Sequence, residues 1–193
     1  RMAVLTGRRR VGKTLLSLEF AKNQRHLYFF VAKKSEALLC EEYAGEILRV
    51  FPEAPVPSGI RAFKDIFHLL LTIAKDEAVT VILDEFQEFY NINPSVYSEM
   101  QKLWDLYKTK CRLNVICVGS VYSLMHKIFE GAKEPLFNRA DRILTIRPFS
   151  IKTLGVILRD HKAGDVRQLF DYYLFTGGIP KYIELLVENK AFS

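Results

Sequence analysis

The feature that most constrains the fold is an eight-residue stretch, "GRRRVGKT", which follows the apolar run "MAVLT" near the start of the chain. Its order of glycine, four residues, glycine, lysine and a hydroxyl residue is the spacing of a loop whose backbone N–H groups surround a phosphate. The next residues, "KTLLSLEFAKN", carry apolar side chains at helical spacing, so we predict that a helix begins near Gly12. The stretch therefore predicts a strand, a phosphate-binding loop and a helix in succession.

Strand-like and helix-like patterns alternate through residue 148, and this order is typical of a sheet with helices on both faces. The run 79–83 is continuously apolar and rich in β-branched residues, as expected of a central parallel strand, whereas 142–148 alternates. We expect five strands, at 2–6, 26–32, 79–83, 113–119 and 142–148. The pattern predicts an α/β fold with a five-stranded, mainly parallel sheet flanked by helices.

The strand-like runs stop at Pro148, and three helical patterns follow. We therefore expect a nucleotide-binding core over 1–148 and a small helical appendage over 149–193. Because the chain begins almost directly at its first strand, we also expect it to be a fragment of a longer polypeptide that continues beyond the appendage.

Composition restricts the setting in which the chain works. No apolar run approaches the roughly 18 residues of a membrane span, and no basic-then-apolar leader opens the sequence. The three cysteines, Cys40, Cys111 and Cys117, are odd in number and lack the spacing of a zinc site. We predict a cytoplasmic protein with reduced thiols and no membrane association.

Each position of the loop has a predicted role. Gly7 and Gly12 permit backbone conformations and a close approach that a side chain would forbid. The N–H groups of Val11, Gly12, Lys13 and Thr14 would face phosphate oxygens, helped by the helix dipole. We expect the Lys13 ammonium to contact the terminal phosphates and the Thr14 hydroxyl to bind Mg²⁺.

A second candidate half-site lies in "VTVILDEFQEFY", where a buried strand ends in two carboxylates. Asp84 could hold the hydrated Mg²⁺ whose other protein ligand is Thr14. Glu85 could polarise an attacking water as a general base. The alternative is that both residues merely begin a solvated loop.

Ser120 ends the strand "LNVICVGS" and could hydrogen-bond the attacking water or the γ-phosphate. It could equally cap the helix that follows, and the two roles are compatible. Asn114 is a weaker candidate because it lies at the start of the same strand.

Three arginines, Arg8, Arg9 and Arg10, occupy the variable positions of the loop. We group them with the nucleotide-binding residues, although their side chains could also form a solvated basic rim that attracts polyphosphates. Our hypothesis is that at least one of them contacts an acidic partner surface, a further domain of the same chain, a second copy, or nucleic acid.

Taken together, these motifs resemble those of the archaeal-type ATPases, a group within the AAA+/STAND branch of P-loop NTPases that also occurs in bacteria. The resemblance covers nearly the whole chain and includes "VICVGSVYSLM", "PLFNRADRILTIRPFS" and "FTGGIPKYI". It implies Mg²⁺-dependent binding and hydrolysis of ATP on a five-stranded core with a helical lid. Arginines in the first motif are common in that family.

The resemblance also implies roles for two residues outside the two motifs. Gly178, Ile179 and Pro180 resemble a Gly-x-Pro turn that such lids press against the adenine side of the nucleotide, although "GGIP" could simply separate two helices. Arg139 resembles an arginine that the family places close after "PLY/F-G", and we group it with the catalytic residues. Asn138 stands here where the family usually has glycine.

Three functions remain open from the sequence: an ATPase, a nucleotide-loaded switch with slow turnover, and a nucleic-acid-binding module that uses the net charge of +6. No Asn-Lys-x-Asp motif for reading guanine occurs. A small-molecule kinase would not need a base adjacent to Asp84. We therefore favour the ATPase.

Overall fold

The structure, a computed structural model, describes residues 1–161 and 168–189 of the chain. Its strands form one sheet in the order β2-β3-β4-β1-β5, and every neighbouring pair is parallel. The strands are β1 (Met2–Thr6), β2 (His26–Phe30), β3 (Val79–Asp84), β4 (Leu113–Gly119) and β5 (Arg142–Thr145). The predicted five-stranded α/β sheet is confirmed.

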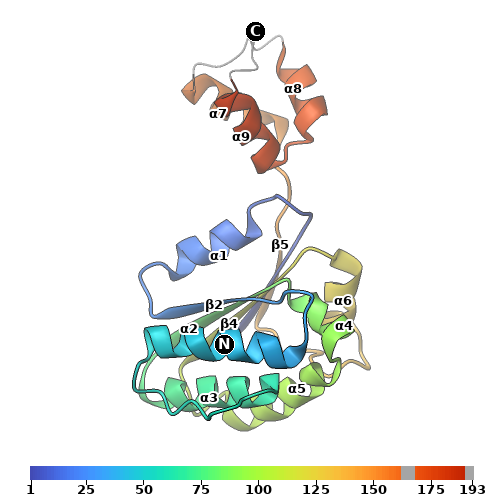
Figure 1. Cartoon of the computed structure of the whole chain (residues 1–193). Helices are drawn as coiled ribbons and strands as arrows, with labels where there is room; N and C mark the ends of the chain where they lie inside the picture. Colours follow the sequence, from blue (N-terminus) through green and yellow to red (C-terminus); the bar gives the residue numbers. More distant parts are fainter. Residues whose placement is uncertain (162–167, 190–193) are drawn as a thin grey trace.

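Helices cover both faces of this sheet (Figure 1). The helices of the described residues are α1 (Lys13–Ala21), α2 (Glu36–Val50), α3 (Phe63–Asp76), the 3-10 helix η1 (Phe86–Glu88), α4 (Phe89–Ile92), α5 (Ser95–Tyr107), α6 (Tyr122–Glu130), α7 (Ile151–Asp160), α8 (Leu169–Thr176) and α9 (Pro180–Glu188). Helix α1 lies on one face, and α2, α3 and α5 lie on the other. We call α7, α8 and α9 the helical unit; it stands beyond the carboxyl edge of the sheet.

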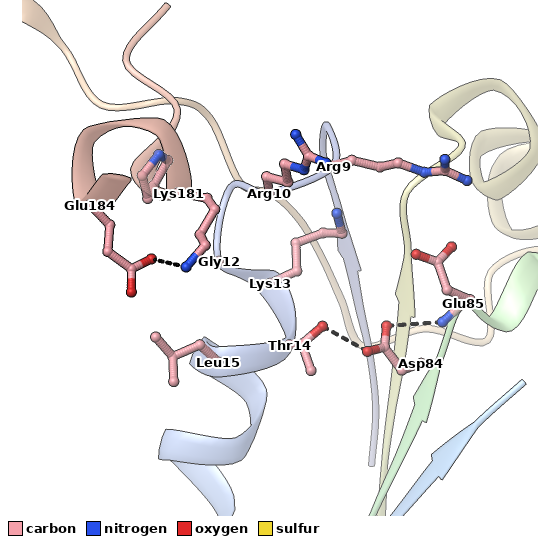
Figure 2. A pocket seen from close by; sticks show the side chains of 11 residues that line it. Arg9, Arg10, Gly12, Lys13, Thr14, Leu15, Asp84, Glu85, Lys181 and Glu184 are labelled. Atoms are coloured by element: carbon pink, nitrogen blue, oxygen red, sulfur yellow. Dashed lines mark hydrogen bonds and ion pairs between the residues drawn. The ribbon is translucent and has the colours of Figure 1, made fainter. Parts of the chain in front are cut away.

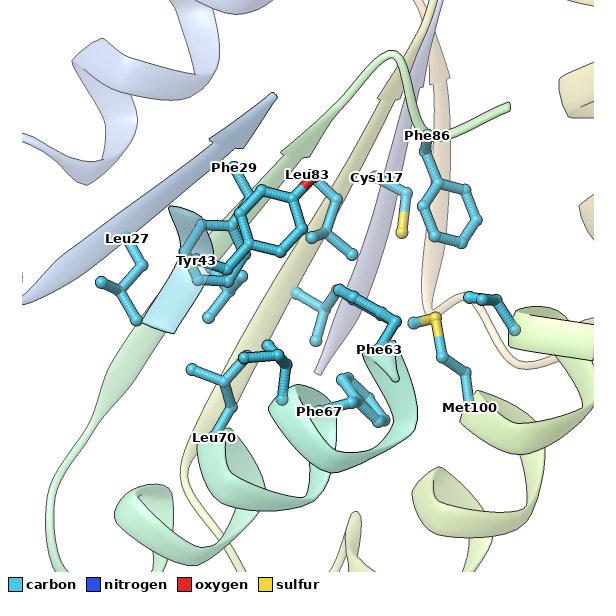
Figure 3. Packing of buried hydrophobic residues seen from close by; sticks show 14 of the residues in the cluster. Leu27, Phe29, Tyr43, Phe63, Phe67, Leu70, Leu83, Phe86, Met100 and Cys117 are labelled. Carbon is cyan, nitrogen blue, oxygen red and sulfur yellow. The ribbon is translucent and has the colours of Figure 1, made fainter. Parts of the chain in front are cut away.

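The main core fills the space between the sheet and helices α2, α3 and α5 (Figure 3). Alternation along β2 turns Leu27 and Phe29 toward this face, and the Phe29 ring stacks on Tyr43 of α2 with centroids 4.2 Å apart. Phe63 and Phe67 enter from α3, on the stripe that the helical spacing predicts. Packed aromatic rings of this kind contribute more than their buried area alone.

The opposite face of the sheet carries a smaller cluster under α1. Its buried members are Leu5, Ala21, Ile82, Ile116 and Val118. Of the apolar residues that the sequence placed at helical spacing in α1, Ala21 is buried and Leu18 packs against this cluster. The other three point outward: Leu15 is 72%, Leu16 47% and Phe20 60% exposed. The buried stripe is Lys13, Ser17 and Ala21, because the small side chains at 17 and 21 let the helix approach the sheet while the lysine faces the loop.

The last strand also differs from its predicted form. The alternating run 142–148 forms only the short strand β5, and all four of its residues are exposed. β5 is an edge strand that pairs with β1, and none of its residues belongs to a buried cluster of the described chain. The other edge strand, β2, buries Leu27 and Phe29 because α2 packs against it.

The chain then enters the helical unit, whose own buried cluster is Leu154, Leu158, Tyr172 and Ile183. The pattern "DVRQLFDYYLF" begins outside the described residues, and α8 accounts for its second part. Within 1–161 and 168–189, no helix combines the length and apolar character needed to cross a membrane.

Candidate functional site

The loop between β1 and α1 has the backbone geometry that its two glycines were predicted to provide. Gly7 has φ 143°, and a Cβ placed on it would lie 2.3 Å from the carbonyl oxygen of Ile146. Gly12 has φ 89° in the left-handed region and stands at the N-cap of α1, with no side-chain cap on the first amides of the helix. A helix N-terminus with uncapped N–H groups is a favourable place for an anion.

Lys13 lies across this loop. Its Nζ donates to the carbonyl oxygens of Gly7 and Arg8, both at 2.9 Å. Burial lowers the pKa of Lys13, while the nearby carboxylates of Glu85 and Asp84 act in the opposite direction. The ammonium is therefore held at the mouth of the loop, beside two negative groups.

Asp84, at the end of β3, is 4% exposed and is surrounded by donors. Its Oδ2 accepts from the Thr14 hydroxyl at 2.7 Å and from the Tyr28 hydroxyl at 2.9 Å, and its Oδ1 accepts from the Glu85 amide at 2.9 Å. Proteins usually hold Mg²⁺ through one or two side-chain oxygens together with phosphate and water. The adjacent hydroxyl of Thr14 and carboxylate of Asp84 fit this ion (Figure 2).

Glu85 follows with a positive φ of 55°, and two donors hold its side chain. The Ser120 hydroxyl donates to Oε2 at 2.8 Å, and Gln87 Nε2 donates to the same oxygen. Arg9 reaches Ser120 from the loop, with Nε 3.5 Å from Oγ. The N-cap of α6 is Val121, so the alternative that Ser120 caps this helix is wrong.

A pocket of about 630 Å³ lies between these groups and the helical unit. Lys13, Thr14, Asp84 and Glu85 line it on the sheet side. Pro180, Lys181 and Glu184 line it on the side of α9, where Lys181 Nζ and Glu184 Oε2 are 2.8 Å apart. Figure 2 shows the two sides facing each other across the loop.

The three loop arginines lie in three different environments. Arg10, with φ 67°, donates from Nη1 to the Tyr182 hydroxyl at 3.0 Å, and its guanidinium carbon lies 5.4 Å from the centre of that ring. Arg9 lines the pocket and extends to the side of Glu85 (Figure 2). Arg8 is exposed and is not among the residues that line the pocket.

Three other residues singled out from the sequence lie elsewhere. Arg139 forms an ion pair with Asp105 of α5 at 2.8 Å and donates to the Phe137 carbonyl, away from the pocket. Asn138 has φ 55°, a conformation that asparagine tolerates better than most residues. Asn114 lies near Thr80 at the start of β4, and its proposed contact with the γ-phosphate has no support from this geometry.

The sequence "GGIP" separates α8 from α9, as one of its two interpretations expected. The other interpretation is compatible with it, because Pro180 is the first residue of α9 and lines the pocket. Val11, predicted to offer its N–H to phosphate, has a buried side chain.

Sequence reasoning missed Tyr28, Gln87 and Tyr182. Gln87 stands alone as an amide in the aromatic run after Asp84 and Glu85, a signal that could have been noticed. Tyr28 reaches Asp84 because β2 and β3 are neighbours, which only the strand order shows.

Comparisons with known proteins show the family and the fold of this chain. The family described as "ATPase domain predominantly from Archaea" matches residues 1–186. An uncharacterized protein of Methanocaldococcus jannaschii, MJECL04, is 29% identical over 181 residues, which are 94% of this chain and 38% of that protein. The chain thus spans well under half the length of this relative.

Two solved structures share the fold. The Walker-type ATPase PABY2304 of Pyrococcus abyssi superposes with a TM-score of 0.72 at 18% identity, covering 96% of this chain and 61% of that one. The ORC1 protein of Aeropyrum pernix, solved in complex with DNA, superposes with a TM-score of 0.62 at 13% identity, covering 98% and 53%.

Proposed function

Since the chain belongs to the family of ATPase domains found predominantly in Archaea, we propose that it binds ATP together with Mg²⁺ and hydrolyses the γ-phosphate in the pocket between the loop and α9. Family membership and fold support a general ATPase function. The observation that carries the finer proposal is the convergence of Lys13, Thr14, Asp84 and Glu85 on one pocket.

Each of these side chains has a role that its contacts support. The uncapped amides at the start of α1 bind phosphate oxygens, and Lys13 exchanges its carbonyl partners for the terminal phosphates. Thr14 and Asp84 hold Mg²⁺, which when bound neutralises phosphate charge. Tyr28 keeps the Asp84 carboxylate in place from the neighbouring strand.

Glu85 is the proposed general base. Both hydrogen bonds to its carboxylate go to Oε2, so among the described residues Oε1 accepts none. Oε1 is therefore the atom that takes the proton of the attacking water. Arg9, which contacts Ser120, lies on the same side and provides a cation beside the γ-phosphate.

The helical unit is the proposed lid of this site. Pro180 lines the pocket next to the loop, and Arg10 connects the loop to Tyr182 of α9. Binding of a polyphosphate to the loop would change the surroundings of Arg10. We therefore propose that nucleotide occupancy is communicated to α9 through this pair.

Replacement of the proposed base tests the function. Glu85→Gln should bind ATP–Mg²⁺ with unchanged affinity and lose about a hundredfold or more in turnover, because volume is kept and the base is lost. Glu53→Gln, at an exposed carboxylate in a loop outside the pocket, is the matched control. Phosphate release, measured with Mg²⁺ and with a chelator, gives the turnover rate, and calorimetric titration gives the affinity for ATP–Mg²⁺.

If Glu85→Gln hydrolysed ATP at the wild-type rate, the proposed role of Glu85 as general base would be contradicted. Tight binding without turnover in the wild type would favour the alternative, a nucleotide-loaded switch.

A second candidate is nucleic-acid binding. The net charge of +6 and the exposed Arg8 favour it, and the A. pernix ORC1 relative was solved with DNA. Retention of a short fluorescent DNA duplex that weakens steeply with salt, and that Arg8→Gln reduces, would support it. A further domain of the same polypeptide or a second copy of the chain is the other proposed partner of Arg8.

A further inference from the structure

The Gln87 side chain is a buried amide in contact with the site. It belongs to η1, immediately after Glu85, and is 1% exposed. Its Nε2 donates to Glu85 Oε2. Its Oε1 is the single buried side-chain nitrogen or oxygen that lacks a hydrogen-bond partner within residues 1–161 and 168–189.

Packing and charge together fix how this amide is oriented. A Cβ placed on Gly119 would lie 2.6 Å from Gln87 Oε1, so the end of β4 closes directly over the amide. The Glu85 carboxylate offers only acceptors, and the NH₂ group must therefore face it. Glycine at 119 leaves the room that the amide occupies.

Stability alone does not explain a glutamine at this position. A buried carbonyl oxygen without a partner is destabilising, and an apolar side chain of similar size would avoid that cost. What the amide gains is a hydrogen bond to a carboxylate, the stronger kind of hydrogen bond. The contact with Glu85 is therefore the feature that accounts for the residue.

We infer that Gln87 is a positioning residue for Glu85, an inference that rests on the proposed hydrolysis. Gln87 of η1 and Ser120, directly after β4, donate to the same oxygen, Oε2. Two donors on one oxygen fix the rotation of the carboxylate about its last bond. Oε1 is thereby kept toward the pocket, where it receives the proton of the attacking water.

Gln87→Met keeps the length of the side chain and removes the donor. We expect kcat to fall about tenfold or more, the effect of one hydrogen bond to a charged group, while ATP affinity stays within about twofold. Gln101→Met, on α5 and outside the pocket, is the control for the same exchange.

A double-mutant cycle separates positioning from a structural role. If Gln87 acts through Glu85, Gln87→Met should change kcat less than about twofold in the Glu85→Gln background. An equal loss in both backgrounds, or an unchanged kcat in Gln87→Met alone, would overturn the inference.

Gln87→Asn provides a second probe, because its shorter amide cannot reach Oε2 yet remains polar. It should reproduce the loss of kcat, and wild-type turnover in a Gln87→Asn variant that circular dichroism shows to be folded would overturn the inference even if Gln87→Met fails to fold. An inactive Glu85→Gln beside a fully active Gln87→Asn would overturn only the positioning role. A wild type without ATPase activity would overturn the proposed function itself.

Discussion

The sheet and the helical unit form two sides of one pocket and are stabilised very differently. The main core joins four strands to α2, α3 and α5 through fully buried aromatic rings. Among residues 1–161 and 168–189, the cluster in the helical unit has four buried residues and is separate from that core. Conformational entropy must be offset by burial, so a small cluster supports only a marginally stable element.

Among the described residues, the loop after β1 contacts the helical unit through Arg10, which donates to Tyr182 at 3.0 Å. In the segment that joins β5 to α7, the Phe149 amide donates to the Gly178 carbonyl at 2.7 Å. The groups assigned to chemistry all belong to the stable region, whereas Pro180 and Tyr182 belong to the other. On the proposed function, this difference would give the catalytic groups a fixed geometry and leave α9 free to move.

The largest expected effect is a difference in the free energy of unfolding between a variant in the main core and a variant in the helical unit. Phe67→Ala should lower the free energy of unfolding by about 3–5 kcal/mol, because it leaves a cavity in the main core. Ile183→Ala should leave that transition within about 0.5 kcal/mol of the wild type, since the helical unit opens locally.

Denaturant unfolding followed by the fluorescence of Trp104 measures this contrast, because the sole tryptophan is buried in the main core. A shift of similar size from Ile183→Ala would show that the two regions unfold as one.

Two lysines in the pocket provide the second contrast. Lys13→Ala should weaken ATP–Mg²⁺ binding about a hundredfold or more, since it removes a cation held at the loop. Lys181→Ala, on α9, should weaken it less than about tenfold, because Lys181 already pairs with Glu184 at an exposed position. Calorimetric titration compares them, and equal losses would show that α9 binds phosphate directly.

The smallest expected effect concerns the contact between the loop after β1 and helix α9. Arg10→Gln should change ATP affinity less than about tenfold at near-physiological salt, where surface attraction is screened. We also expect ATP to protect the helical unit from proteolysis, and Arg10→Gln should abolish that protection, whereas Arg8→Gln should not. Persistent protection in Arg10→Gln would remove the Arg10–Tyr182 pair from the proposed coupling.

The succession of strands and helices along the chain and the glycine-rich and acidic motifs could be predicted because they depend on residues close together in the sequence. The outward position of Leu15 and Leu16 could not, since helical spacing identifies a stripe but not which face the sheet selects. Tyr28 and Arg139 have partners far away in the sequence, at Asp84 and Asp105, which strand order and helix packing bring close.

The backbone of Glu85 shows a conflict between folding and chemistry. Its left-handed conformation is one that glycine adopts freely and that costs a side-chain-bearing residue of order 1 kcal/mol. Selection for stability alone would favour glycine here, whereas the proposed role requires a carboxylate. If Glu85 is the general base, stability and activity favour different residues at the end of β3, and the protein retains backbone strain there in order to retain activity.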